Sequence, residues 1–156
     1  MSSIRSIFLA AVISFALSDR SFSQQYQTAI GLKVGNMAVI EYKKFFSDNL
    51  AMDISSGIYL VDYPGLFTNI VFQYHHNFKP ENFRWFYGAG IGTRIGRFDR
   101  NEIGLAGSIG MEFSVPEVSL AFSIGFQPVM FIELGNLFQE YYLTGPATVG
   151  VKYLLN

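Results

Sequence analysis

The chain has 156 residues, of which 50% are apolar, 17% are aromatic and only 15% carry a charge. A soluble domain usually has about 25% charged residues, so this composition suits one domain whose outer surface meets hydrocarbon. The net charge of −1 argues against a basic nucleic-acid-binding surface. The lack of cysteine excludes disulfides, thiol catalysis and zinc–thiolate sites.

Residues 1–23 are predicted to be a cleaved signal peptide. Arg5 supplies a positive charge, Ile7–Leu17 is an apolar run of eleven residues, and Ser21 and Ser23 are small residues before a cut at Gln24. An N-terminal anchor helix is the less favoured alternative, because crossing a bilayer takes about 20 helical residues. Residues 24–156 are then expected to form a single β-barrel domain.

Beyond Gln24, apolar residues recur with the period of two that is typical of β-strands. Clusters of turn-forming residues divide this region into eight segments. Each segment is long enough to cross a bilayer as a tilted strand, which takes about 9–11 residues. The expected strands are Tyr26–Val34, Met37–Phe45, Leu50–Val61, Leu66–Phe78, Phe83–Ile95, Ile103–Phe113, Val118–Glu133 and Gln139–Leu155.

The two faces of these segments differ in the way expected of a membrane barrel. In Ile103–Phe113 and Val118–Phe126, bulky apolar residues alternate with glycine, alanine and serine. The small-residue face carries too little charge for the whole water-exposed surface of a soluble protein, but it suits the crowded interior of an eight-stranded barrel. Apolar side chains outward and polar ones inward are typical of transmembrane barrels. The predicted fold is therefore all-β, an eight-stranded antiparallel up-and-down transmembrane β-barrel.

Aromatic residues near the segment ends predict a girdle at each rim. One girdle would contain Tyr26, Phe45, Phe46, Tyr74, Phe83, Trp85, Phe113 and Tyr153. The other would contain Tyr59, Tyr63, Phe67, Phe98, Phe131, Phe138 and Tyr141.

The stretch 74–96, YHHNFKPENFRWFYGAGIGTRIG, resembles the small OmpA/OmpX-like outer-membrane β-barrels of Gram-negative bacteria, in which a tight periplasmic turn precedes an aromatic-glycine strand. Val118–Pro128 resembles their penultimate strand and Ala147–Leu155 their closing strand. The resemblance implies an outer-membrane location and assembly by the barrel-assembly machinery. The chain departs from the family pattern at its end, Tyr153-Leu154-Leu155-Asn156, where such strands commonly finish on an aromatic residue.

Strand alternation places five basic and three acidic residues in the lumen. They are Lys33, Glu41, Lys43, Asp53, Arg84, Arg94, Glu112 and Lys152. Unpaired charges in a narrow lumen are costly, so we expect a network in which Arg84 and Arg94 pair with acids such as Glu41, Asp53 or Glu112. A small ion path is the alternative, but side chains usually fill a barrel of this size.

Few residues suggest catalysis. His75 and His76 are neighbours on a strand and point to opposite sides, so they cannot jointly bind a metal. Gly88, Gly90 and Gly92 have the spacing of a phosphate loop, but no helix follows them, and they indicate room for large neighbours inside the barrel. We find no nucleophile or metal motif, and we expect neither enzymatic activity nor a cofactor.

Pro128 and Pro146 cannot donate to a ladder, so they are expected to mark the outer rim, at bulges. Val129–Gly145 would then project outside the membrane, with Phe131, Phe138, Tyr141 and Tyr142 as a candidate contact surface for a partner or lipopolysaccharide.

The favoured function is structural or interactive, as an outer-membrane barrel with a plugged lumen. The expected partners are outer-membrane lipid, lipopolysaccharide and the barrel-assembly machinery, and no nucleic acid. The alternatives are a lipid-modifying enzyme or hydrophobic-ligand carrier, and a narrow channel.

Overall fold

The computed structural model describes residues 26–60, 65–78, 82–96, 101–133, 141–145 and 147–155. Ten strands contain most of these residues, and one short 3-10 helix, η1 (Pro116–Val118), joins two of them. No helix in these residues is long and apolar enough to span a membrane. The strands are β1 (Thr28–Gly35), β2 (Met37–Phe45), β3 (Leu50–Tyr59), β4 (Gly65–Asn77), β5 (Phe83–Gly96), β6 (Asn101–Val115), β7 (Leu120–Phe126), β8 (Val129–Glu133), β9 (Tyr141–Thr144) and β10 (Ala147–Leu155).

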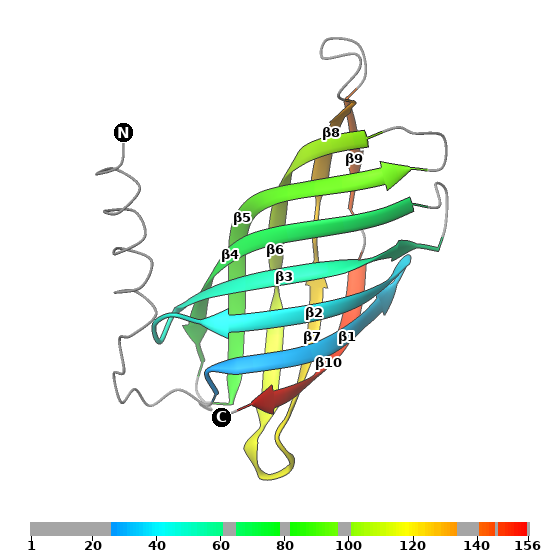
Figure 1. Ribbon diagram of the computed structural model, residues 1–156. Helices are drawn as coiled ribbons and strands as arrows, with labels where there is room; N and C mark the ends of the chain where they lie inside the picture. The colour runs from blue at the N-terminus through cyan, green and yellow to red at the C-terminus, as the bar shows by residue number, and fades with distance from the viewer. Residues whose placement is uncertain are drawn as a thin grey trace, which may run out of the picture.

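The strands form a closed antiparallel barrel (Figure 1). Each of β1 to β6 pairs with the next strand along the chain, and β10 pairs with both β7 and β1 to close the ring. β8 continues the line of β7, and β9 leads into β10. Each of these two pairs forms one interrupted barrel strand, so the ten strands make an eight-stranded barrel. The prediction of an eight-stranded antiparallel barrel is confirmed.

The ladder formed by β7 and β8 is interrupted at Pro128 without a bulge. Phe126 pairs with Ala147 below the interruption and Val129 pairs with Thr144 above it, so three steps separate these pairs on both strands. The register against β6 is likewise unchanged from Phe126 to Val129. The expectation of a bulge at Pro128 was therefore wrong, because this proline removes a donor without adding a residue to the ladder. Pro146, the other predicted position, lies outside the described residues.

The barrel wall bends sharply at β5, where Gly88, Gly90 and Gly92 lie on the inward side. A Cβ atom on Gly90 would lie 1.9 Å from the carbonyl oxygen of Ile70, so the close approach of β4 requires glycine there. The bend also brings Cα atoms of β4 and β6 within 8 Å of each other, although β5 lies between them. The row of inward glycines, Gly88, Gly90 and Gly92, thus makes a corner of the barrel. It also leaves room in the lumen for side chains from the flanking strands β4 and β6.

The outer wall is apolar along most of its height. Ile40 and Leu105 are both 64% exposed, and isoleucine, leucine, valine and aromatic side chains alternate with buried ones on every long strand. Most buried lysine, arginine, aspartate and glutamate side chains lie on the opposite, inward face of the same strands. This distribution is the reverse of a soluble barrel, in which charged residues face water.

The aromatic residues form the two predicted girdles only in part. In the first girdle, Phe46, Phe83 and Trp85 are partly exposed. Tyr74, Phe113 and Tyr153 are exposed on the outer wall as expected. Five others are buried in the lumen, because they occupy the inward parity of their strands: Tyr26, Phe45, Tyr59, Phe67 and Phe131. Tyr63, Phe98 and Phe138, and the side chain of Tyr141, lie outside the described residues.

The two adjacent histidines face opposite sides, as predicted. His75 is buried in the lumen, where its ring lies between those of Phe45 and Phe86. His76 faces outward and stacks on Trp85, with ring centroids 4.6 Å apart and planes at 12°.

Candidate functional site: the barrel lumen

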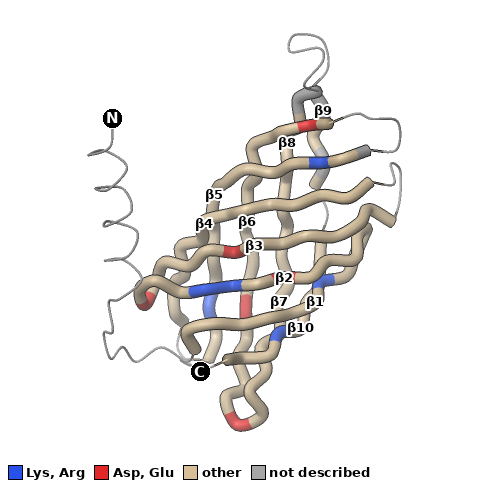
Figure 2. The backbone as a smooth tube through the Cα atoms, in the orientation of Figure 1, with Lys and Arg blue, Asp and Glu red and all other residues tan. Residues whose placement is uncertain are grey.

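The structure places all eight charged residues predicted for the lumen inside the barrel. Each is at most 7% exposed. They come from β1, β2, β3, β5, β6 and β10. Figure 2 shows that the charged positions are few, and that most of the chain that forms the wall is uncharged.

Glu112 on β6 is one centre of the ion-pair network. Its Oε1 lies 3.2 Å from Arg84 Nη2, and its Oε2 lies 3.4 Å from Lys43 Nζ and also contacts Lys152 Nζ. Tyr26 donates its hydroxyl hydrogen to Oε1 at 2.5 Å. One carboxylate thus meets three cations and a phenol, an arrangement that compensates for removing its charge from water.

Glu41 on β2 is the second centre. Its Oε1 lies 3.1 Å from Lys33 Nζ, 3.4 Å from Lys152 Nζ and 3.7 Å from Lys43 Nζ. Lys33 also donates to Asp53 at 3.2 Å. Since Lys43 and Lys152 contact both glutamates, the seven charged groups form one connected cluster.

Glycines on the intervening strands let these long side chains meet. Gly31 lies between Glu41 and Lys152 in the sheet register, and a Cβ on it would lie 2.6 Å from Lys152 Cγ. Gly150 lies between Lys33 and Ser123 in the same way. A charge on one strand followed by glycine on the next is therefore a sequence signal for a long side chain that reaches across.

Arg94 belongs to a separate pair nearer the other end of the barrel. Its Nε donates to Glu102 Oε2 at 2.5 Å, and its guanidinium group lies 4.9 Å from the Phe131 ring centroid and 5.6 Å from that of Tyr59. The predicted partners Glu41, Asp53 and Glu112 were wrong for Arg94, although Glu112 does pair with Arg84. Glu102 escaped prediction because the strand was expected to begin at Ile103, whereas β6 begins at Asn101.

Gln73 connects the charge cluster to neutral groups. Its Nε2 donates to Asp53 at 3.2 Å and to Ser108 at 3.0 Å, across the glycine corner. With both amide hydrogens engaged, its oxygen accepts from His75 Nε2 at 3.3 Å, so the neutral His75 ring carries its hydrogen on Nε2. Ser108 lies on the small-residue face of Ile103–Phe113 that was predicted to face the interior. Gln73 was not predicted as a lumen residue, although it has the same parity as the inward His75.

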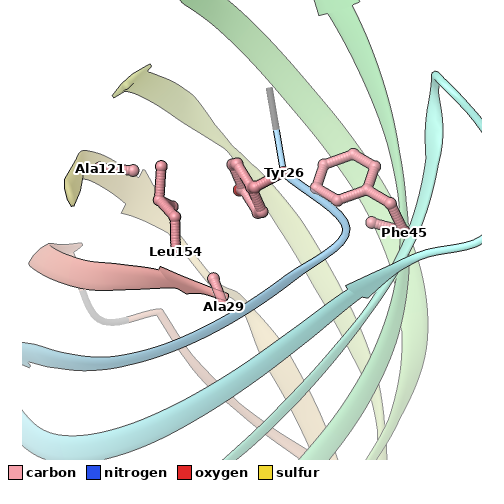
Figure 3. Close-up of a cluster of buried hydrophobic side chains, with 6 residues drawn as sticks. Tyr26, Ala29, Phe45, Ala121 and Leu154 are labelled. Atoms are coloured by element: carbon pink, nitrogen blue, oxygen red, sulfur yellow. The ribbon is translucent and has the colours of Figure 1, made fainter. Parts of the chain in front are cut away.

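An apolar cluster closes the lumen at the end where the described chain begins. Tyr26 and Phe45 pack edge to face, with ring centroids 5.2 Å apart. Arg84 lies 4.8 Å from the Tyr26 ring and 4.9 Å from the Phe45 ring. Figure 3 shows Tyr26 and Phe45 beside small and apolar side chains from other strands, and the full cluster comprises Tyr26, Ala29, Phe45, Ala51, Ala121 and Leu154.

Two more apolar clusters occupy the lumen on the other side of the charged groups. One contains Met37, Val39, Tyr59 and Phe67. The other contains Val71, Ala106, Val129 and Phe131. Every side chain in these clusters is at most 8% exposed. Each cluster contributes one ring that contacts Arg94, Tyr59 from the first and Phe131 from the second. Apolar side chains therefore separate the Arg94–Glu102 pair from the larger charge cluster.

The predicted outer contact surface is not formed as expected. Phe131 is fully buried, because the unbroken register across position 128 places it on the inward face of β8. Phe138 lies outside the described residues, as do the side chains of Tyr141 and Tyr142, whose backbones belong to β9. The exposed residues of this hairpin include Met130 and Leu143, which pair in register on the outer wall.

The arrangement of these strands matches a known barrel. The crystal structure of the N-terminal β-barrel domain of Pseudomonas aeruginosa OprF superposes with a TM-score of 0.59 at 14% sequence identity, over 82% of this chain and 95% of that one. The chain has the OmpA-like eight-stranded barrel fold. At this identity the likeness concerns the fold alone. No protein-family model and no curated protein sequence matches the chain.

Proposed function

We propose that this protein is an integral barrel of the bacterial outer membrane, with a structural or surface-interaction role and a lumen plugged by side chains. The observation that carries the location is the inverted surface: the wall exposes large apolar side chains, while nine charged side chains are buried inside. In water such an arrangement would expose hydrocarbon and bury charge, and both are costly. In a bilayer the apolar wall is solvated by lipid.

The contents of the lumen support the plugged state. The charge cluster holds its cations against Glu41, Glu112 and Asp53. Apolar clusters lie at both ends of it. An ion crossing the barrel would have to displace buried ion pairs and then pass apolar side chains, so we expect no steady conduction. No arrangement of the described side chains favours the enzymatic alternative over this proposal.

Cell fractionation and bilayer recording test the two halves of the proposal. The mature protein, beginning at Gln24 after removal of residues 1–23, should be found in the outer membrane and should shift its gel mobility on heating, as folded barrels do. N-terminal sequencing of the same material checks the cleavage site. Purified barrel in planar bilayers should give no steady single-channel steps. A soluble protein would overturn the location, and reproducible conductance steps would favour the narrow channel.

A further inference from the structure

A hollow on the outer wall lies across β1, β2 and β3 and reaches the edge of β4. Its volume is about 650 Å³. Most of its lining follows two rows of outward side chains in the sheet register: Val34, Ala38, Ile58 and Leu66 in one, and Leu32, Ile40 and Ser56 in the other. Thr68 continues the second row beside the hollow, opposite Ser56. Ala38 and Ser56 are shorter than their neighbours in these rows, so the wall is recessed between them.

One edge of the hollow is polar. Ser56 donates to the carbonyl oxygen of Phe67 at 3.0 Å, and its Oγ lies 3.0 Å from Thr68 Oγ1. Thr93, the next outward residue in this row, donates to the carbonyl oxygen of Thr68 at 3.4 Å. With the Ser56 hydrogen engaged, the bond between the two hydroxyls takes its hydrogen from Thr68. All three hydroxyl hydrogens are then engaged, and the oxygens retain lone pairs that can accept.

These hydroxyl oxygens lie among exposed apolar side chains. Ile58 and Leu66 flank them on one side, and Ile70 and Ile91 on the other. Ser56 Oγ already accepts from Thr68, and the remaining lone pairs face hydrocarbon, where they lack the hydrogen bonds that water would give them. A ligand that brings its own hydroxyl or amide hydrogen would satisfy them, whereas an ester oxygen would not. The chemistry of this edge therefore selects a hydrogen-bond donor on an apolar chain.

The depth of the hollow selects the leaflet. Ala38 is the second residue of β2, directly after the turn at Gly35-Asn36, and this turn lies at the end of the barrel opposite the termini. Because membrane barrels have short periplasmic turns and longer outer loops, we expect the termini to lie on the periplasmic side, which makes this end the outer-leaflet end. Among the described residues that line the hollow, the only charged one is Lys33, whose side chain points inward to Glu41 and Asp53. The hollow itself therefore offers nothing to an ionic headgroup.

We propose that this hollow binds one hydroxylated acyl chain of lipopolysaccharide, with the chain against Ala38 and its hydroxyl donating to Ser56 or Thr68. The inference rests on the proposed outer-membrane location. The proposed lipid contact lies on the outer face of β1 to β4, away from the segment 129–145 that the sequence had suggested.

Native mass spectrometry of the folded, full mature protein tests the proposal with two probes, hydroxyacylated lipid A and phosphatidylethanolamine of matched chain length. The wild-type protein should retain one lipid A in preference to the phospholipid. Ala38→Phe fills the hollow and should reduce lipid A retention about fivefold or more, the effect of losing roughly one good contact. Ser56→Ala with Thr68→Val should reduce lipid A retention to the level of the phospholipid.

Ala89→Phe is the matched control, since Ala89 is an exposed alanine on the outer wall of β5, away from the hollow. It should retain lipid A as the wild type does. Equal retention by Ala38→Phe, or an undiminished lipid A preference in the double variant, would overturn the proposal. If Ala38→Phe does not fold, as judged by heat-modifiability, the double variant decides. A barrel that is found in the outer membrane but has no lipid A preference would overturn this inference alone, whereas a soluble protein would overturn the proposed function as well.

Discussion

Glu112 shows how single residues allow charge to be buried in this barrel. It lies within ion-pair distance of Lys43, Arg84 and Lys152, and it also accepts from Tyr26. Each buried charge loses its hydration, and only several good contacts can offset that loss. The stability of the cluster therefore depends on its acids, because the described lumen buries five basic and four acidic side chains.

Replacing Glu112 with glutamine should destabilise the barrel strongly. The change keeps the shape of the side chain but leaves Lys43, Arg84 and Lys152 short of one buried negative charge. We expect a loss of about 3–5 kcal/mol in the free energy of unfolding, the usual cost of breaking a buried pair from one side. Urea unfolding of the protein in lipid vesicles measures it.

Glu117→Gln provides the comparison, because Glu117 is exposed in the short helix between β6 and β7. It should change stability by less than about 0.5 kcal/mol. Similar losses for the two variants would mean that the Glu112 network contributes nothing beyond the general effect of removing an acid.

A related prediction concerns Gly31, one of the glycines whose lack of a side chain makes room for long side chains in the lumen. A Cβ at this position would lie 2.6 Å from both Lys152 Cγ and the carbonyl oxygen of Val151. Gly31→Ala should therefore cost about 1–3 kcal/mol through overpacking. At Gly107 the nearest atom to a new Cβ is Pro128 Cγ at 3.1 Å, so Gly107→Ala should cost less in the same urea assay. The reverse order would contradict the role given to Gly31.

At the scale of elements, Pro128 interrupts a ladder whose register is otherwise intact. The amide of Gly107 donates to the Pro128 carbonyl oxygen at 2.7 Å. In an antiparallel pair the reciprocal bond would run from residue 128 to Gly107, but proline has no hydrogen to give. The interruption is therefore one missing backbone hydrogen bond between β6 and the interrupted strand formed by β7 and β8.

Pro128→Ala should restore that bond. The new amide should exchange its hydrogen about tenfold more slowly than an exposed amide, as a hydrogen bond worth roughly 1.4 kcal/mol would cause. Global stability should change little, because removing proline also frees the unfolded chain. NMR hydrogen exchange measures the protection, with Pro116→Ala in the exposed turn as the unprotected comparison. Rapid exchange of the new amide in the Pro128→Ala variant would show that the strands are separated there.

The strands were predictable because a period of two persists through each of them, and the observed bounds of β2 are the predicted ones. The lumen charges followed from the same alternation. The ion-pair partners of these charges could not be predicted in the same way, since Arg94 pairs with Glu102 through a strand register that no local pattern encodes. The placement of Phe131 failed for a related reason: a proline can signal either a bulge or a missing bond, and the two differ in which face the next residues take.

At the scale of the whole molecule, the two ends of the barrel differ. Tyr26 and the end of β10 lie at one end, beside the turns at 46–49 and 116–119. The turn at Gly35-Asn36, the Arg94–Glu102 pair and the β8–β9 hairpin lie at the other (Figure 1). Membrane barrels have short periplasmic turns and longer outer loops. The longest connection between described strands, residues 134–140, joins β8 to β9 at the end opposite the termini, so we expect the end that carries the termini to face the periplasm.

Cysteine labelling of intact cells tests this orientation. Asn36 and Asp48 are exposed residues in turns at opposite ends, and the chain contains no native cysteine. An impermeant thiol reagent should label Asn36→Cys and leave Asp48→Cys unlabelled until the outer membrane is permeabilised. Labelling after permeabilisation confirms that each cysteine is accessible in the folded protein. Labelling of Asp48→Cys alone in intact cells would invert the orientation, and would place the hollow beside Ala38 in the periplasmic leaflet, where lipopolysaccharide is absent.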